Sequence, residues 1–206
     1  MYWTGQDNAG RGVILKAKMD GRGEYETVVG PNVNLTNPRK LALEPRDGTQ
    51  LYYADGKQGK GQKILVADTR SKDSIRVFKT IDQCQRRQDQ VKCEDYEPRL
   101  MRGIGVVGDR VYYSHDPDKF IRSCNKLNGT DCRVDRPTVS DAFEMTDLGF
   151  YSSDTQPMNR KNDCEGNGGC SHFCVLSGSS YACVCPFGYT NSDSDPKKCK
   201  IVWNRW

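Results

Sequence analysis

Short runs of β-branched and aromatic residues, separated by Gly, Pro, Asn and Asp, make up most of residues 1–155. The alternating run at 38–45 (Pro-Arg-Lys-Leu-Ala-Leu-Glu-Pro) and the apolar run at 63–68 (Lys-Ile-Leu-Val-Ala-Asp) are typical, because a turn signal follows each of them. No stretch keeps the 3.6-residue period of an amphipathic helix. The pattern therefore predicts an all-β region of short strands joined by tight turns.

An aromatic pair followed by two small or polar residues recurs along this region. It appears at 2–5 (Tyr-Trp-Thr-Gly), 52–55 (Tyr-Tyr-Ala-Asp) and 112–115 (Tyr-Tyr-Ser-His), with a degenerate fourth copy at 149–152 (Gly-Phe-Tyr-Ser). The runs that precede and follow these copies make each unit a predicted four-stranded antiparallel blade. A single blade cannot bury both of its faces, so blades stack around an axis as a β-propeller.

About three such blades fit into the repeat region, whereas a closed propeller needs about four to eight. The predicted fold is therefore an all-β, partial β-propeller of about three blades with open edges. Unpaired strand edges invite association, so we expect self-association through these edges if the chain is complete. Because no secretory signal opens the sequence, we favour the alternative that it is a section of a longer protein.

The cysteines indicate a disulfide-bonded protein of an oxidising compartment. There are 10 in 206 residues, and six of them lie between Cys164 and Cys199, as in a small disulfide-rich module. The other four form two pairs that fall in polar insertions: Cys84 with Cys93, and Cys124 with Cys132. Pairing within each insertion would pin its loop, although spacing alone leaves the connectivity open.

Charge and hydropathy narrow the class of partner. The net charge of +4 is small for this length and gives no case for nucleic acid. No apolar run approaches the length of a membrane span, so a membrane link is expected only through a segment outside this sequence. Two Asn-x-Thr sequons, at Asn34 and Asn128, are candidate glycosylation sites that fit an extracellular or cell-surface location.

The repeats are flanked by Pro-x-x-Leu-Ala-Leu and Lys-Ile-Leu-x-Ala, and the run Cys164-Glu-Gly-Asn-Gly-Gly-Cys170-Ser-His-Phe-Cys174 follows them, then Cys183-Val-Cys185-Pro-Phe-Gly-Tyr189. Together these features resemble the YWTD repeats of low-density lipoprotein receptor-type β-propellers and the EGF-like module that comes after them. The resemblance implies a six-bladed propeller, of which this chain is similar to the C-terminal half. We expect a partial propeller over 1–158, an EGF-like domain over 159–200 and a tail or linker over 201–206.

The resemblance also implies the pairing of the six clustered cysteines. The implied pairs are Cys164–Cys174, Cys170–Cys183 and Cys185–Cys199. Two departures limit what is carried over. Calcium-binding EGF modules place Asp or Asn two residues after the third cysteine, where this chain has Leu176, so we expect no metal here. The last residue of the YWTD repeat is Asp only at Asp55, which puts a capping role at Gly5 and His115 in doubt.

Motifs that carry chemistry elsewhere have structural explanations here. Residues 103–108 match the dinucleotide-binding pattern Gly-x-Gly-x-x-Gly, but they lead into another strand instead of a helix, which indicates a hairpin turn. The chain has two histidines and no nucleophile or zinc motif, so we expect no catalytic residues and no cofactor. His115 is a hypothetical pH switch, since histidine titrates in the endosomal range; the competing interpretation is an exposed turn residue.

The leading functional hypothesis is a non-catalytic, extracellular protein-binding segment of a lipoprotein-receptor-related endocytic or signalling receptor. Its partner would be an extracellular protein ligand or a matrix component. The alternative is a secreted matrix or adhesion protein in which the propeller–EGF unit is structural. A third class, the calcium-dependent hydrolases with a propeller fold, requires acidic, Asn and His ligands around a central channel, and the sequence shows no such set.

Overall fold

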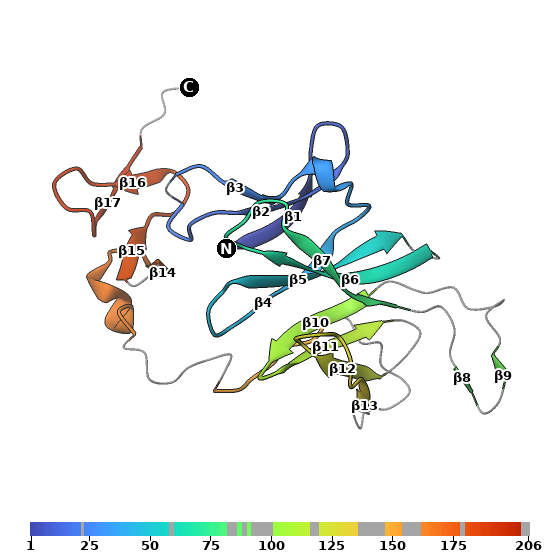
Figure 1. Cartoon of the computed structure of the whole chain (residues 1–206). Coiled ribbons are helices and arrows are strands. Elements are labelled where there is room, and N and C mark those ends of the chain that lie inside the picture. The colour runs from blue at the N-terminus through green and yellow to red at the C-terminus, as the bar shows by residue number, and fades with distance from the viewer. Residues whose placement is uncertain are drawn as a thin grey trace, which may run out of the picture. The chain divides into compact units, whose positions relative to one another are not determined.

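The chain is described from a computed structural model (Figure 1). The structure describes residues 1–21, 23–57, 60–81, 86–87, 90–91, 101–115, 120–135, 147–153, 162–177 and 180–202. It divides into two compact units. Residues 2–15 and 27–158 form the first, which we call the propeller unit; Met1 and residues 16–26 and 159–206 form the second, the EGF-like unit.

Three antiparallel sheets, each a meander, build the propeller unit. The first sheet has the strands β1 (Tyr2–Gln6), β2 (Gly12–Lys16) and β3 (Glu26–Val29), followed by a 3₁₀ turn at Pro31–Val33. The second has β4 (Arg39–Leu43), β5 (Gln50–Lys57), β6 (Lys60–Asp68) and β7 (Ile75–Thr80). The third has β10 (Met101–Val107), β11 (Arg110–His115), β12 (Ile121–Asn125) and β13 (Arg133–Asp135). A two-residue pair, β8 (Arg86–Arg87) with β9 (Gln90–Val91), lies between the second and third sheets in the sequence.

The second and third sheets are the four-stranded blades that the repeats predict, and the all-β fold of a partial propeller is confirmed. The aromatic pair explains why the sheets pack side by side. Successive residues of a strand point to opposite faces, and Tyr52 and Tyr53 of β5 therefore enter different cores. Tyr53 packs between the first and second sheets, whereas Tyr52 packs between the second and third.

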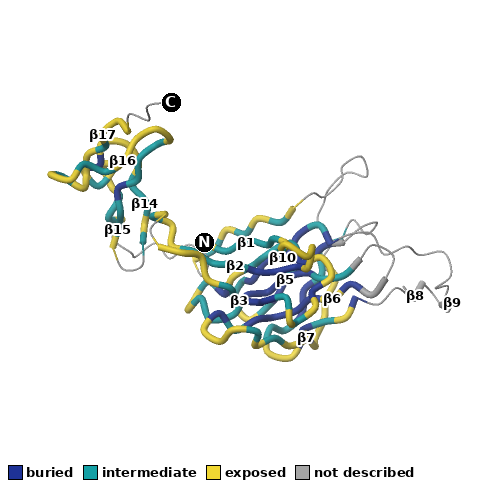
Figure 2. The backbone as a smooth tube through the Cα atoms, turned by 90° about the horizontal axis from the view of Figure 1, so that it is seen from above, coloured by how far each residue is buried: buried dark blue, intermediate teal, exposed yellow. Residues whose placement is uncertain are grey.

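The two cores join the three sheets into one body. Tyr52 meets Phe78 edge-on, with ring centroids 5.4 Å apart, a geometry worth about 0.5–1.5 kcal/mol beyond burial. On the facing sheet, Ile104, Val106 and Tyr113 are buried in the same core. Figure 2 shows the buried positions concentrated in the central strands β5, β6 and β10. Each inner face is thus covered by the neighbouring sheet, as the repeat argument requires.

Asp55, the last residue of the second repeat, fastens the connection between two sheets. Its carboxylate accepts hydrogen bonds from the backbone amides of Thr36, at 3.2 Å, and Asn37, at 2.7 Å, just before β4 begins. Gly5, at the corresponding place in the first repeat, has no side chain to do this. Glycine at that position therefore provides no such backbone cap.

The fourth copy of the repeat, at 149–152, is not a strand. The prediction of a further aromatic strand is wrong for the described residues 147–153, which have no ladder partner among the described strands. They lie instead against β10, where Leu148 and Phe150 cover two glycines.

Two small hairpins are the paired strands of the described residues 162–202 in the EGF-like unit. The first pairs β14 (Phe173–Ser177) with β15 (Ser180–Val184), and the second pairs β16 (Tyr189–Asn191) with β17 (Cys199–Ile201). A 3₁₀ segment at Glu165–Gly169 precedes them. Within the described residues of the whole chain, no helix has the length and apolar character that crossing a bilayer requires.

Candidate interaction face

Four turns meet at one end of the propeller unit, and we call this end the turn face. Strands in a meander alternate in direction, so the first and third turns of a sheet lie at the same end. In the second sheet these are 44–49 and 69–74, and in the third sheet 108–109 and 126–132. Contacts between the turns of different sheets hold this end together.

A buried ion pair joins the two sheets at the turn face. Lys126 Nζ donates to Glu44 Oε2 at 2.8 Å, and the side chains are only 15% and 7% exposed. Beside it, the hydroxyl of Tyr52 donates to Gln50 Oε1 at 2.8 Å, and the Lys126 carbonyl lies 3.3 Å away. Burial raises the pKa of Tyr52, so its hydroxyl remains a donor at neutral pH. The loop that follows β12 is thereby fixed to the first turn of the preceding sheet.

The same loop is closed by a disulfide and pressed against the neighbouring sheet. Cys124 and Cys132 are bonded, which is the local pairing that the insertion suggested. Gly129 has a φ of +69°, and a Cβ there would lie 2.4 Å from the backbone oxygen of Phe78. Only glycine satisfies both the left-handed backbone and this close approach.

Leu127 and Asn128 form the exposed tip of this loop. The Leu127 side chain is 76% exposed, while its amide donates to Asn125 Oδ1 at 2.9 Å. Asn128 Oδ1 accepts from both the amide of Thr130, at 3.1 Å, and its hydroxyl, at 2.7 Å. The tip is therefore ordered by its own hydrogen bonds, although its side chains project into solvent.

Charged side chains of both signs lie around the tip and pair with one another. Arg110, whose side chain is 12% exposed, donates to Ser123 Oγ and to the carboxylate and carbonyl of Asp131. Arg133 donates to the same carboxylate at 3.0 Å. The hydrogen bonds from Arg110, and then those from Arg133, lower the pKa of Asp131 below its ordinary value. Arg110 thus clamps the two ends of the loop.

The second sheet contributes a further ion pair and a small pocket to the turn face. Arg70 donates to both oxygens of Asp68 at 3.1 Å, and this hydrogen bonding lowers the pKa of Asp68. Nearby, a pocket of about 220 Å³ lies between the ends of β5, β6 and β7, and polar Gln50 and Arg76 are among its lining residues.

This arrangement suits contact with another protein. An exposed apolar side chain on an ordered loop, with charged side chains around it, is compatible with contact to another protein, in which an apolar centre has a polar rim. In the described residues, no three His, Cys, Asp or Glu side chains converge as a metal site would require.

The two sequons occupy different backbone settings. Asn34 is exposed and ends the 3₁₀ turn in a left-handed conformation, with a φ of 56°. Asn128 is exposed at the tip of the turn face. Both side chains are accessible, and glycosylation at either position stays a prediction.

In the EGF-like unit, three disulfides replace a hydrophobic core. The bonded pairs are Cys164–Cys174, Cys170–Cys183 and Cys185–Cys199. They are the same pairs that the resemblance implies. Asn167 supports them from within, because its amide donates to the carbonyls of Cys170 and His172 and its oxygen accepts from the Cys174 amide.

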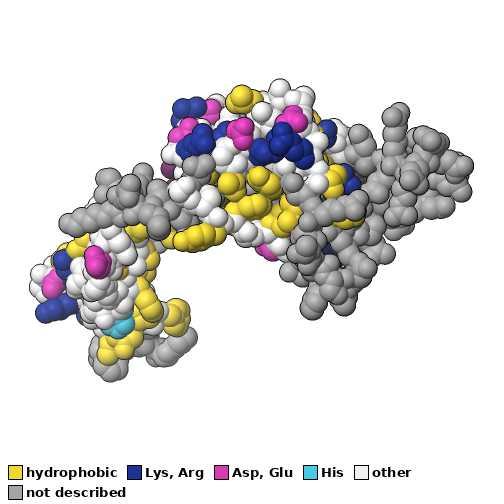
Figure 3. Space-filling model, turned by 90° about the horizontal axis from the view of Figure 1, so that it is seen from below, with side chains coloured by type: hydrophobic (Ala, Val, Ile, Leu, Met, Phe, Trp, Pro, Cys, Tyr) yellow, Lys and Arg dark blue, Asp and Glu magenta, His cyan; other side chains and the backbone are white. Residues whose placement is uncertain are grey.

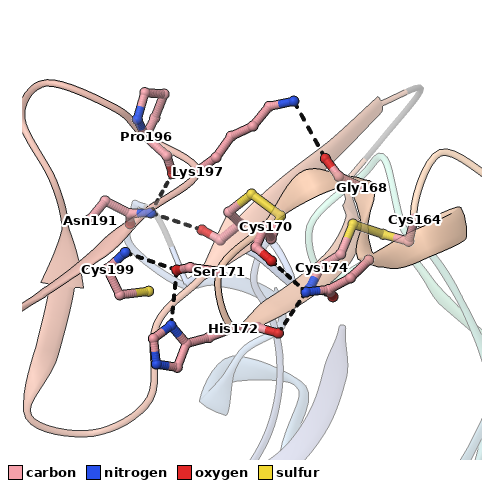
Figure 4. The surroundings of a disulfide bond; sticks show 12 residues. Cys164, Gly168, Cys170, Ser171, His172, Cys174, Asn191, Pro196, Lys197 and Cys199 are labelled. Atoms are coloured by element: carbon pink, nitrogen blue, oxygen red, sulfur yellow. Dashed lines mark hydrogen bonds between the residues drawn. A yellow bond between two sulfur atoms is a disulfide. The ribbon is translucent and has the colours of Figure 1, made fainter.

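Figure 4 shows how the segment just before the first hairpin is tied to β17 near the disulfides. Ser171 Oγ accepts from the amide of Cys199 at 3.0 Å and lies 2.9 Å from His172 Nδ1. The His172 ring is 5.4 Å from that of Tyr189. Leu176, which stands where calcium-binding modules have an oxygen ligand, is 53% exposed.

Three of the predicted site residues lie wholly or partly outside the described part of the chain. Cys84 and Cys93 lie outside the described residues, and their pairing stays a prediction. The backbone of His115 ends β11 opposite Met101, but its side chain lies outside the described part.

Sequence reasoning missed the Glu44–Lys126 ion pair, because the partners are 82 residues apart and no local pattern links them.

Comparison with known proteins supports the resemblance. No family model matches the chain. It is 33% identical over 91 residues to low-density lipoprotein receptor-related protein 4 of Mus musculus, covering 44% of this chain and 5% of that protein. It is 32% identical over 99 residues to low-density lipoprotein receptor-related protein 5 of Homo sapiens, covering 47% and 6%. It is 25% identical over 208 aligned residues to the vitellogenin receptor Yl of Drosophila melanogaster, covering 100% and 9%.

The chain spans less than a tenth of the length of these curated relatives. Among solved structures, a chain of a nidogen/laminin complex is similar, with a TM-score of 0.31 and 16% identity over 62% of this chain and 56% of that one. The relatives are named receptors, not enzymes. The chain is therefore similar to a segment of the low-density lipoprotein receptor-related receptors, with YWTD-type propeller sheets followed by an EGF-like module.

Proposed function

We propose that this chain is a non-catalytic, extracellular protein-binding segment of a lipoprotein-receptor-related endocytic or signalling receptor. The turn face would contact an extracellular protein ligand. The observation that carries the proposal is Leu127, an apolar side chain 76% exposed on a loop that is closed by a disulfide. Because the loop is already ordered, binding would require little further loss of conformational freedom.

The surrounding charges support the same proposal. The pairs Arg70–Asp68 and Arg133–Asp131 present both signs to solvent, so the face offers complementary contacts without the single-sign field of a polyanion-binding site. A glycan at Asn128 would stand directly beside Leu127.

A binding experiment with matched variants tests the proposal. An array of secreted and matrix proteins is probed with the chain. The affinity of each saturable interaction is then measured for the unaltered chain and for Leu127→Asp. Phe187→Asp is the control, because Phe187 is fully exposed in the other unit. We expect Leu127→Asp alone to weaken binding at least tenfold, about the effect of losing an interface anchor. If both variants lose affinity equally, or if neither loses affinity, the assignment of binding to the turn face is contradicted.

The full-length transcript distinguishes the two hypotheses on cellular role. A membrane-spanning segment and cytoplasmic tail would support the receptor, whereas a secreted protein without an anchor would support the matrix or adhesion alternative.

Self-association is a second part of the proposal, because β1 is an edge strand among the described strands. Light scattering at micromolar concentration tests it, and a monomer would contradict it.

A further inference from the structure

The disulfide between Cys124 and Cys132 differs from the others in how solvent reaches it. Cys132 is exposed, and among the described cysteines it alone is. Its partner Cys124 is fully buried in the core between the second and third sheets. The six cysteines of the EGF-like unit are buried or half-buried. A thiolate in solution therefore reaches this disulfide from the side of Cys132, and exposed disulfides are the labile ones in thiol–disulfide exchange.

The charges beside Cys132 favour an anionic reagent. Arg110 and Arg133 each donate to the carboxylate of Asp131 at 3.0 Å. Two guanidinium groups around one carboxylate leave one positive charge in excess. Figure 3 shows Lys and Arg side chains beside Asp and Glu side chains on the surface of the propeller unit, where such charges are open to solvent. The thiolate is the form that attacks a disulfide, and an excess of positive charge attracts it.

A buried hydroxyl lies beside the sulfur that would leave. The hydroxyl oxygen of Tyr113 is 3.8 Å from Cys124 Sγ, and Tyr113 is 4% exposed. Burial alone disfavours a thiolate, whereas a hydrogen bond to the charged form stabilises it. The Tyr113 hydroxyl can therefore offset the cost of releasing Cys124 inside the core. On the other side of the bond, Cys132 Sγ lies 3.4 Å from the carbonyl oxygen of Gly129, which can accept from the thiol once it forms.

We propose that Cys124–Cys132 is a site of thiol–disulfide exchange with a dithiol, in which Cys132 is attacked and Tyr113 donates to the leaving Cys124. One thiolate of the dithiol bonds to Cys132 Sγ as the Cys124–Cys132 bond breaks, and the electron pair leaves with Cys124, which takes up a proton. The second thiolate then attacks the reagent sulfur bound to Cys132, so that Cys132 leaves and is protonated. The dithiol becomes a disulfide, and the protein gains its two electrons and two protons.

Reduction changes the turn face because this bond closes its loop. The exposed tip at Leu127 lies within the closed loop of residues 124–132. After reduction the loop keeps hydrogen bonds such as those from the Asn125 amide to the Thr130 carbonyl and from the Gly129 amide to the Asn125 carbonyl, both 2.8 Å. These are neutral bonds of modest net strength, whereas the disulfide restricts the opened loop itself. The tip therefore opens more often in the reduced chain.

The order of reduction in the full 206-residue chain tests the exchange site. The chain is treated with graded dithiothreitol, quenched and alkylated, and the state of each cysteine is read by mass spectrometry. We expect Cys124–Cys132 to be reduced at least about tenfold faster than any disulfide of the EGF-like unit. With glutathione, a monothiol, we expect the mixed disulfide on Cys132 and the free thiol on Cys124. A rate no greater than those of the EGF-like unit, or a glutathione adduct on Cys124 instead, overturns the proposal.

A matched pair of variants tests the hydroxyl. We expect Tyr113→Phe to be reduced about three- to tenfold more slowly at Cys124–Cys132, because the leaving thiolate loses a hydrogen bond. Tyr53→Phe is the control at the corresponding position of the second repeat, where the hydroxyl has no hydrogen-bond partner among the described atoms, and its rate should be unchanged. A substitution that only loosened the sheet would speed reduction, so the slowing separates a direct role from a structural one. Unchanged or faster reduction in Tyr113→Phe overturns the role of the hydroxyl.

Hydrogen exchange of the oxidised and reduced chains tests the effect on the turn face. We expect the amides of Leu127 and Thr130 to exchange roughly tenfold or more faster after selective reduction, because the closed loop is lost. Amides of the EGF-like unit, whose disulfides stay intact, should exchange at their original rates. Unchanged exchange at Leu127 and Thr130 contradicts the release of the loop. None of these measurements uses a ligand of the turn face, so this proposal and the proposed binding function fail independently.

Discussion

Replacing Lys126 by methionine removes one partner of the ion pair that joins the second and third sheets. Glu44 would keep a carboxylate that is 7% exposed and whose Oε1 already lacks a partner among the described atoms. Removing one member of a buried pair typically lowers the free energy of unfolding by about 3–5 kcal/mol. Because the lysine itself is 15% exposed, water can reach the vacated place, and we expect about 3 kcal/mol.

The assay is native-state hydrogen exchange at β5 and β12, which reports opening of the propeller unit separately from the EGF-like unit. The double variant Glu44→Met, Lys126→Met should recover most of the loss, because two apolar side chains need no counter-charge. The matched control is Arg133→Met, whose pair with Asp131 is 63% and 56% exposed; its effect should be below about 1 kcal/mol. A loss under 1 kcal/mol for Lys126→Met, or a double variant as unstable as the sum of the singles, would refute the reasoning.

Four further outcomes are expected. Asp55→Asn should lower the free energy of unfolding by about 1–2 kcal/mol in urea titration, since its charge-assisted hydrogen bonds to two backbone amides are weakened. Gly129→Ala should lower it by about 1–3 kcal/mol in the same assay, because its Cβ meets backbone 2.4 Å away and φ is positive. Hydrogen bonds from Arg110 hold the pKa of Asp131 in the folded chain below 3.8, its ordinary value. The ionised Asp131 therefore stabilises the folded state fully above that pH, and this contribution is lost only as pH falls through the lower pKa of the folded chain. Asp131→Asn should therefore leave the slope of unfolding free energy against pH unchanged between pH 7 and about 5, as measured by an acid titration of stability. If His115 is a pH switch, His115→Gln should slow ligand dissociation at about pH 5.5 and not at pH 7.4, and an unchanged rate at the lower pH rejects the switch.

The repeat pattern predicted much of the propeller unit because its causes are local. The aromatic pair at 52–53 alternates across a strand, and the strand's two faces follow from that alternation alone. The turn signal at Asp47-Gly48 is likewise local, since Asp47 closes its own turn by accepting from Thr49. The fourth repeat misled for the same reason. Its residues 149–152 have the local pattern of a strand, but no described strand pairs with them.

The contacts of the turn face could not be predicted in this way. The Glu44–Lys126 pair joins side chains 82 residues apart, and Gly129 is needed because Phe78, 51 positions earlier in the printed numbering, brings a carbonyl against it. In the sequence, Leu127 is one apolar residue in a polar insertion. Its importance as a projecting side chain depends on the loop that holds it.

The sequence by itself determined the all-β class, the four-stranded units and the disulfide-rich module, because strand alternation, turn chemistry and cysteine spacing act over a few residues. Only the tertiary structure decided which sheet faces are covered, and by what. Ala42 and Gly105 have equivalent positions in their sheets, yet one lies beneath a whole sheet and the other beneath the ring of Phe150. Coverage depends on which distant segments pack together, and packing is a property of the assembled chain that no local pattern encodes.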